Sequence, residues 1–417
     1  MNLFHLFSIL IVLSAGFAYI NFRLLKLPTA IGLMLVSLIF SFVILLLGYF
    51  YPSLTAIVEA RLENLNFSEL LLESMLSFML FAGAIHIKYE DLRSEKLSII
   101  LFSTVSVLIS TFVVGFAAYY LLNYFGIEVQ LIHALLFGAL ISPTDPIAVL
   151  SILKRAGVPK SLETKIAGES LFNDGVAVVI FITILKLAQP GAALDASSVL
   201  MLFGQEAIGG VILGIIIGVL GYKLIASIDN YQVEVLITLA VVMGGYTLSH
   251  YIHVSGPLAM VVAGIIIGNH GKQYGMSHMT AEYIDKFWEL VDEILNAILF
   301  VLIGMEVLIL QTSSTILWVA IILLVISVVT RYISLWIPSR IIKLREKITQ
   351  RTLVILTWGG LRGGISIALA LSIQPEFHKE IWVTVTYVIV CFSILVQGMT
   401  IGKLAKKTTQ ILKLPDL

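Results

Sequence analysis

Charge is what this chain has least of. Only 12% of its 417 residues are Asp, Glu, Lys or Arg, whereas a soluble domain has about 25%. This shortage argues against a long soluble domain, and no basic tail of the kind that binds nucleic acid is present. The chain also has a single cysteine, Cys391, so it cannot form an intramolecular disulfide.

The chain consists largely of long apolar runs. Hydrophobic residues make up 59% of the chain, and the mean hydropathy is +1.01. Apolar runs of about 20 residues recur along the whole length, which is typical of a polytopic helical membrane protein. We predict an all-α protein with thirteen transmembrane segments, near 3–21, 29–50, 66–86, 98–123, 130–152, 166–187, 198–227, 232–252, 256–269, 287–310, 314–337, 351–372 and 382–401.

Basic residues predict the orientation of these segments. The first apolar run precedes Arg23 and Lys26, which is the order of a retained first helix and not of a cleaved signal peptide. Loops on one side then hold 21 of the 26 Lys and Arg residues, and the other side holds only Arg61, Lys186 and Lys379. Cytoplasmic loops carry the excess of basic residues. We therefore expect the N-terminus outside and the C-terminus in the cytoplasm.

Two of the predicted segments contain helix-breaking residues. The fifth holds "SPTDP", in which Pro143 and Pro146 flank Thr144 and Asp145, and the twelfth holds four glycines around Arg362. Proline removes a backbone donor and glycine weakens a helix, so both segments should be interrupted. If segments 1–6 and 8–13 are inverted repeats joined by segment 7, the two interruptions correspond. Such matched breaks mark the midplane binding site of a transporter.

Four charged residues fall in the central parts of three predicted segments: Asp145, Glu169, Asp174 and Arg362. Each costs about 2.5–3.5 kcal/mol at the centre of a membrane, so pairing must lower the sum. In a helix, Ser170 and Asp174 share one face, and Glu169 and Asn173 share the adjacent stripe.

Glu169 and Asp174 therefore point in different directions and can have different roles. We expect Glu169 to form an ion pair with Arg362, and Arg331 to reach the cytoplasmic surface. Asp145 and Asp174 then lack a basic partner, and such a site favours a cation or a proton. The alternatives are that Asp145 caps the half-helix after the prolines and that Asp174 is a neutral, hydrogen-bonded acid. Other acids lie nearer the segment ends, namely Glu73, Glu206, Glu234, Glu293 and Glu306.

Four stretches together resemble a known family. "SPTDPIAVL", "GESLFNDGVAVV", "FWELVDEILNAILFVLIGME" and "GGLRGGISIALAL" occur in this order. They closely resemble the electroneutral sodium/proton exchangers of the cation:proton antiporter superfamily (NhaP/NHE type). This resemblance implies a 13-helix fold in which the two interrupted helices cross at the midplane. Its domains would be scaffold and dimerisation helices in 1–97, ion-transport core helices in 98–190, a linker helix and further scaffold helices in 191–312, and core helices with a short cytoplasmic tail in 313–417.

The resemblance also implies roles for the buried polar residues. Asp174 would bind either the cation or the proton, and Asn173 beside it is typical of the branch that exchanges one cation for one proton. The ion- and proton-binding set would be Asp174, Asn173, Asp145, Thr144 and Ser170. Sodium would lie on Asp174, Ser170 and Thr144, with Asp145 acting through water, and Glu169 with Arg362 would be a structural ion pair. Some members carry an acid before "AG" in the third helix, where this chain has Phe81.

We therefore expect a secondary antiporter, not an enzyme, that exchanges sodium or lithium for protons in pH and sodium homeostasis. Its setting would be the inner (plasma) membrane of a prokaryote. No cofactor is expected besides the transported ions, and the expected partners are membrane lipid and a second copy of the chain, without nucleic acid or a soluble partner. The alternatives are potassium/proton exchange and a cation channel or ion-gated sensor, with an intramembrane hydrolase weaker still.

Overall fold

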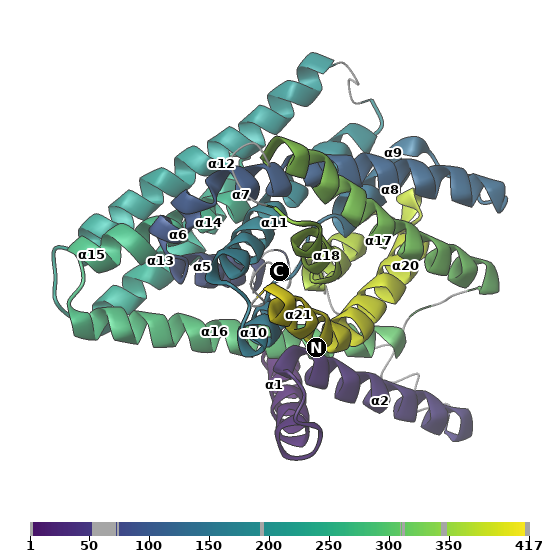
Figure 1. Ribbon diagram of the computed structural model, residues 1–417, viewed down its shortest axis with the longest axis horizontal. Coiled ribbons are helices and arrows are strands. Elements are labelled where there is room, and N and C mark those ends of the chain that lie inside the picture. Colours follow the sequence, from purple (N-terminus) through teal and green to yellow (C-terminus); the bar gives the residue numbers. More distant parts are fainter. Residues whose placement is uncertain are drawn as a thin grey trace.

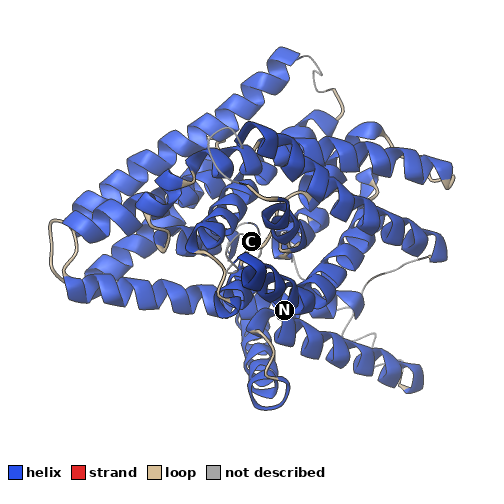
Figure 2. Cartoon of the chain, viewed as in Figure 1, coloured by secondary structure: helices blue, strands red, loops and turns tan. Residues whose placement is uncertain are grey.

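The computed structural model describes residues 3–51, 72, 75–191, 196–308, 310, 313–342 and 348–412. All regular structure in these residues is helical, as Figure 1 and Figure 2 show, and no strand is assigned to them. The predicted third segment lies partly outside the described residues, and Glu73 and Arg61 lie outside them altogether.

The described helices follow the predicted apolar segments closely. They are α1 (Leu3–Ile20), α2 (Thr29–Phe50), α5 (Leu76–Ile85), α6 (Tyr89–Ser94), α7 (Lys96–Ser103), α8 (Val105–Tyr124), α9 (Leu131–Ile141), α10 (Ile147–Ala156), α11 (Lys160–Ala188), α12 (Ala196–Ile225), α13 (Tyr231–Tyr251), α14 (Gly256–Ile266), α15 (Lys272–Tyr274), α16 (His278–Met305), α17 (Ser314–Ile342), α18 (Gln350–Trp358), α19 (Gly364–Leu371), α20 (Lys379–Phe392) and α21 (Gly398–Leu412). Short π-helical turns follow α1, α14 and α20, and 3₁₀ turns cover Glu306–Leu308 and Pro375–Phe377.

Eight helices in the described residues are long and apolar enough to cross a membrane. They include α2, α11, α12, α13 and α17, and α5 and α9 are shorter apolar helices. These observations support a polytopic helical membrane protein. The count of thirteen spans and the inverted repeats stay predictions.

The predicted interruptions of the fifth and twelfth segments are confirmed. The first break separates α9, which ends at Ile141, from α10, which begins at Ile147. The second break separates α18, which ends at Trp358, from α19, which begins at Gly364. The two breaks touch, because the backbone N–H of Asp145 donates a hydrogen bond to the carbonyl oxygen of Leu361 at 2.7 Å.

Glycine permits this contact between the breaks. A Cβ at Gly363 would lie 2.6 Å from the Cβ of Asp145, closer than two such carbons come in proteins. A Cβ at Gly360 would lie 2.8 Å from Nε of Arg331. A larger residue at Gly363 would therefore push the two breaks apart, and one at Gly360 would displace Arg331 of α17.

The 29-residue helix α11 lies near the middle of the molecule in Figure 1. It packs against α7, α9, α12 and α14. Both of its polar stripes, at Glu169 and Asn173 and at Ser170 and Asp174, are buried. This helix therefore brings the predicted site residues beside the two breaks.

Candidate ion-binding site

A cavity of about 760 Å³ lies between the first break, α5, α11, α16 and the start of α19. Its lining includes the buried residues Thr144 and Asp174 at one end. It also includes the exposed lysines Lys88, Lys154 and Lys160. The cavity thus connects the buried polar stripe of α11 with the protein surface.

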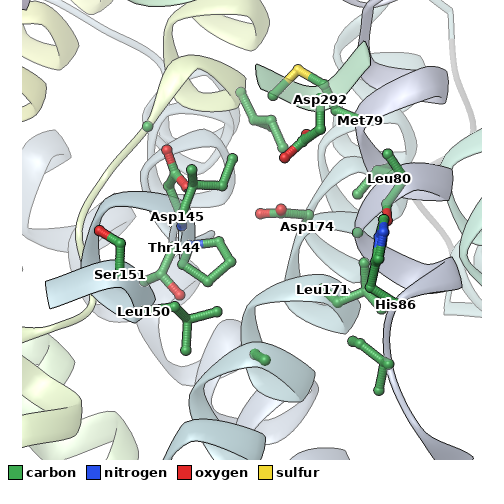
Figure 3. A pocket seen from close by; sticks show the side chains of 18 of the residues that line it. Met79, Leu80, His86, Thr144, Asp145, Leu150, Ser151, Leu171, Asp174 and Asp292 are labelled. Carbon is green, nitrogen blue, oxygen red and sulfur yellow. The ribbon is translucent and has the colours of Figure 1, made fainter. Parts of the chain in front are cut away.

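Asp174 is the buried acid that faces this cavity. It is 6% exposed, and in the described part of the chain its carboxylate has no hydrogen bond or ion pair. Figure 3 shows the carboxylate pointing between Asp145 and Asp292. A carboxylate that is buried without a cationic partner is costly, so this position favours a bound cation or proton.

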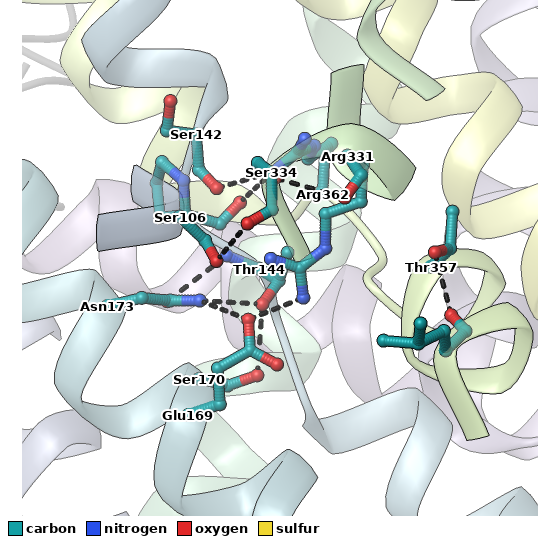
Figure 4. A network of polar contacts seen from close by, with 12 residues as sticks. Ser106, Ser142, Thr144, Glu169, Ser170, Asn173, Arg331, Ser334, Thr357 and Arg362 are labelled. Carbon is teal, nitrogen blue, oxygen red and sulfur yellow. Dashed lines mark hydrogen bonds and ion pairs between the residues drawn. The ribbon is translucent and has the colours of Figure 1, made fainter. Parts of the chain in front are cut away.

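Thr144, Ser170 and Asn173 join the first break to α11 (Figure 4). The side-chain amide of Asn173 donates to Oγ1 of Thr144 at 2.8 Å, and its Oδ1 accepts from the backbone N–H of Thr144 at 3.3 Å. The hydroxyls of Thr144 and Ser170 lie 3.1 Å apart. Asn173 therefore positions the Thr144 hydroxyl, which keeps acceptor capacity for a cation.

Asp145 makes a hydrogen bond at the start of α10 and also lines the cavity. Its Oδ1 accepts a hydrogen bond from the backbone N–H of Ile147 at 2.8 Å, at the start of α10. This bond is the helix-capping role that the sequence left open for Asp145. The same residue also lines the cavity beside Asp174, so capping does not remove it from the site.

The expected ion pair between Glu169 and Arg362 is wrong. Oε1 of Glu169 accepts instead from Nη2 of Arg331 at 2.5 Å, and the two side chains are 2% and 5% exposed. Arg331 is therefore a buried partner and does not reach the surface, which corrects a second expectation. The helical period gives the direction in which Glu169 points, but it does not give the relative depth of α11 and α17.

Arg362 stabilises the first break instead. Its Nη1 donates to the carbonyl oxygens of Ser142 and Pro143, at 2.5 and 2.9 Å. These carbonyls follow the end of α9, where helical partners are missing and the helix dipole is negative. The backbone N–H of Arg362 donates to Oγ of Ser393 at 2.8 Å, and this hydroxyl donates to Gln397. The arginine thus holds the two breaks together, as Figure 4 shows.

The sequence reasoning missed two charged residues, Arg331 and Asp292. Arg331 is one of two arginines inside predicted spans, and this position in the sequence could have indicated that it is buried. Asp292 lies on α16 inside one of the family-like stretches, and it lines the cavity. Phe81, at the position where some family members carry an acid, is fully buried and packs on Trp288 with ring centroids 4.6 Å apart.

Two interrupted helices that cross beside a buried, unpartnered carboxylate are features of a secondary transporter. The comparisons with known proteins define this class more closely. The chain belongs to the sodium/hydrogen exchanger transmembrane family, whose sequence model matches residues 9–407. This finding confirms the resemblance seen in the sequence.

Individual relatives agree over nearly the whole chain. The chain is 48% identical over 402 residues to the Na⁺/H⁺ antiporter NhaP of Pseudomonas aeruginosa, with 95% of each chain covered. It is 33% identical to the Na⁺/H⁺ antiporter NhaH of Halobacillus dabanensis, covering 93% of this chain and 94% of the relative. The fold is similar to that of the sodium proton antiporter MjNhaP1 from Methanocaldococcus jannaschii at pH 8, with a TM-score of 0.72, 18% identity and coverage of 95% and 96%.

Proposed function

We propose that this chain is a secondary antiporter that exchanges Na⁺ for H⁺ at the carboxylate of Asp174. The observation that carries the proposal is this one carboxylate, which is 6% exposed and faces the cavity. Family membership and the names of the relatives support Na⁺ and H⁺ as the exchanged ions.

The site offers the hard oxygen ligands that sodium prefers. Asp174 and Thr144 line the cavity, and the Ser170 hydroxyl lies 3.1 Å from that of Thr144. Asp145 would act through a water molecule. A proton on Asp174 removes the negative charge that attracts the cation, so the two ions compete for one position. The empty anionic site is the costly one to move through a membrane, and exchange follows from this asymmetry.

The charges around the site support a one-for-one exchange. Glu169 and Arg331 neutralise each other in their ion pair. Arg362 and Asp145, on the two touching breaks, contribute one charge of each sign. Among these five residues, only Asp174 then changes its charge with occupancy, and either Na⁺ or H⁺ neutralises it.

The surface end of the cavity supports an inward-facing state. Its lysines, Lys88, Lys154 and Lys160, belong to the predicted basic side of the protein, which would be cytoplasmic. The orientation with the N-terminus outside, the setting in a prokaryotic plasma membrane and the division into scaffold and core helices are parts of this proposal. A homodimer in lipid is a further part, and it rests on the family resemblance.

The test is proton flux in proteoliposomes, scanned across Li⁺, Na⁺ and K⁺ with and without a membrane potential. We expect Na⁺-dependent flux in the wild type that does not change with the potential. Asp174→Asn should insert normally and lose exchange, whereas Asp229→Asn, an exposed acid outside the site, should keep it. Full sodium-driven flux in Asp174→Asn would refute the mechanism.

Two alternatives give different results in the same system. Potassium/proton exchange uses the same carboxylate and would appear as flux driven by K⁺ in preference to Na⁺. A cation channel would give currents above the turnover of a carrier in planar bilayers.

A further inference from the structure

Asp292 brings a carboxylate of α16 beside Asp145 and Asp174 in the ion cavity. Asp145 belongs to the first break, Asp174 to α11 and Asp292 to α16, and all three line the same cavity. Figure 3 shows the three side chains converging on one central space. In the described part of the chain, Asp292 has no Lys, Arg or His within ion-pair distance.

Four other acids of α16 differ from Asp292 in two ways. Glu289 and Glu293 also line the cavity but are exposed, whereas Glu282 and Asp285 are ion-paired. Asp285 forms an ion pair with Lys272, and Glu282 forms one with Lys286 at 2.6 Å. Both of these acids are therefore neutralised locally, and neither lines the cavity. Asp292 is two turns further along the helix than Asp285, and it is half-buried. Its negative charge is thus available to an ion in the cavity.

The surroundings of Asp174 favour a cation or a proton in this space. Asp174 is only 6% exposed and aims its unpartnered carboxylate into the space between Asp145 and Asp292. The helix α5 on the opposite wall, with the sequence "LSFMLFAGAI", presents no carboxylate to the cavity. Among the three α16 acids that line the cavity, Glu289 and Glu293 are exposed, so Asp292 is the half-buried one that a cation meets beside Asp174.

We propose that Asp292 is a cation-binding residue of the antiport cavity that holds an incoming monovalent cation before it reaches Asp174. This inference rests on the proposed function and adds a second position to it. A cation held at Asp292 can wait while Asp174 still carries its proton, and it moves to Asp174 when the proton leaves.

This role has a kinetic signature. In the proposed division, α11 belongs to the moving core and α16 to the scaffold, so the cation leaves Asp292 before the site crosses the membrane. Asp292 thus acts on capture of the cation and not on the crossing step. Its removal should raise the KM for Na⁺ and leave the maximal rate nearly unchanged.

The experiment measures ²²Na⁺ uptake into proteoliposomes under a fixed pH gradient. We expect Asp292→Asn to raise the KM for Na⁺ about tenfold, which is the effect of losing one charge about 6 Å from the cation at an effective dielectric constant of roughly 40. The maximal rate should stay within about twofold of the wild type. Asp292→Glu should restore the wild-type KM, and Glu282→Gln, on the same helix but outside the cavity, should not change it.

A charge restored after folding provides a second measurement. The chain has one cysteine, so Asp292→Cys in a Cys391→Ser background carries a single reactive thiol. A negatively charged methanethiosulfonate should lower the KM of this variant, and a positively charged one should raise it. Because both reagents act on the same folded protein, a folding defect cannot produce opposite shifts.

The outcomes separate this inference from the proposed function. A wild-type KM in Asp292→Asn, or a loss of maximal rate without a change in KM, would overturn the role of Asp292 alone. Absence of Na⁺-dependent uptake in the wild-type protein would instead overturn the proposed exchange.

Discussion

The buried ion pair between Glu169 and Arg331 yields a prediction that can be measured as a free energy. Their side chains are 2% and 5% exposed, and their charged atoms lie 2.5 Å apart. Removing one member of such a pair leaves an uncompensated buried charge, which costs about 3–5 kcal/mol. We therefore expect Arg331→Met to lower the free energy of unfolding by this amount, because Glu169 keeps only a 3.5 Å contact with the amide of Asn173.

A double-mutant cycle isolates the pair from the effects of each substitution. Glu169→Gln combined with Arg331→Met removes both charges, so the double variant should be more stable than Arg331→Met alone. We expect a coupling energy of about 2–3 kcal/mol, the upper part of the range for residues in contact. The assay is reversible unfolding of the detergent-solubilised protein by SDS, followed by circular dichroism.

Two further variants make this cycle decisive. Arg340→Met, on the same helix, removes an exposed arginine that lies over the ring of Trp336 at 4.5 Å, and it should cost about 1 kcal/mol or less. A second cycle pairs Glu169→Gln with Arg362→Met. A coupling energy for Arg362 equal to or larger than that for Arg331 would refute the assignment of Arg331 as the partner of Glu169.

Two other predictions concern the crossing and the hydroxyl beside the ion. Gly363→Ala places a Cβ 2.6 Å from the Cβ of Asp145, so it should destabilise the protein by about 1–3 kcal/mol and abolish exchange. The control Gly244→Ala adds a carbon that meets nothing within 4 Å, so it should not destabilise the protein. Equal unfolding curves for the two variants would contradict the crowding argument. Asn173→Ala removes the amide that holds the Thr144 hydroxyl. It should raise the KM for Na⁺ about tenfold, the effect of losing roughly 1.4 kcal/mol of binding. An unchanged KM in uptake assays would exclude the positioning role of Asn173.

The sequence was sufficient to predict the broken helices and their residues. Pro143 and Pro146 act within their own segment, and so do the glycines around Arg362, because a missing N–H or a missing Cβ weakens a helix regardless of its neighbours. The buried polar stripes of α11 were predictable for the same reason, since the helical period alone sets which residues share a face.

The partners across helices could not be predicted in this way. Whether Glu169 meets Arg331 or Arg362 depends on the relative depth of α11, α17 and the second break, which no local pattern encodes. Asp292 could not be predicted as a site residue because the amphipathic first half of α16 has several acids. The sequence does not distinguish an acid that lines a cavity from one that faces solvent.

The contact between the two breaks has a consequence for biosynthesis. The carbonyl of Ser142 and the guanidinium of Arg362 are 220 positions apart in the chain. At about 5–20 residues per second, a ribosome needs roughly 10–40 s to add that length. During this interval the carbonyls at the proline break of the inserted first half lack their arginine donor. The ion pathway is complete only when the last quarter of the polypeptide reaches the bilayer.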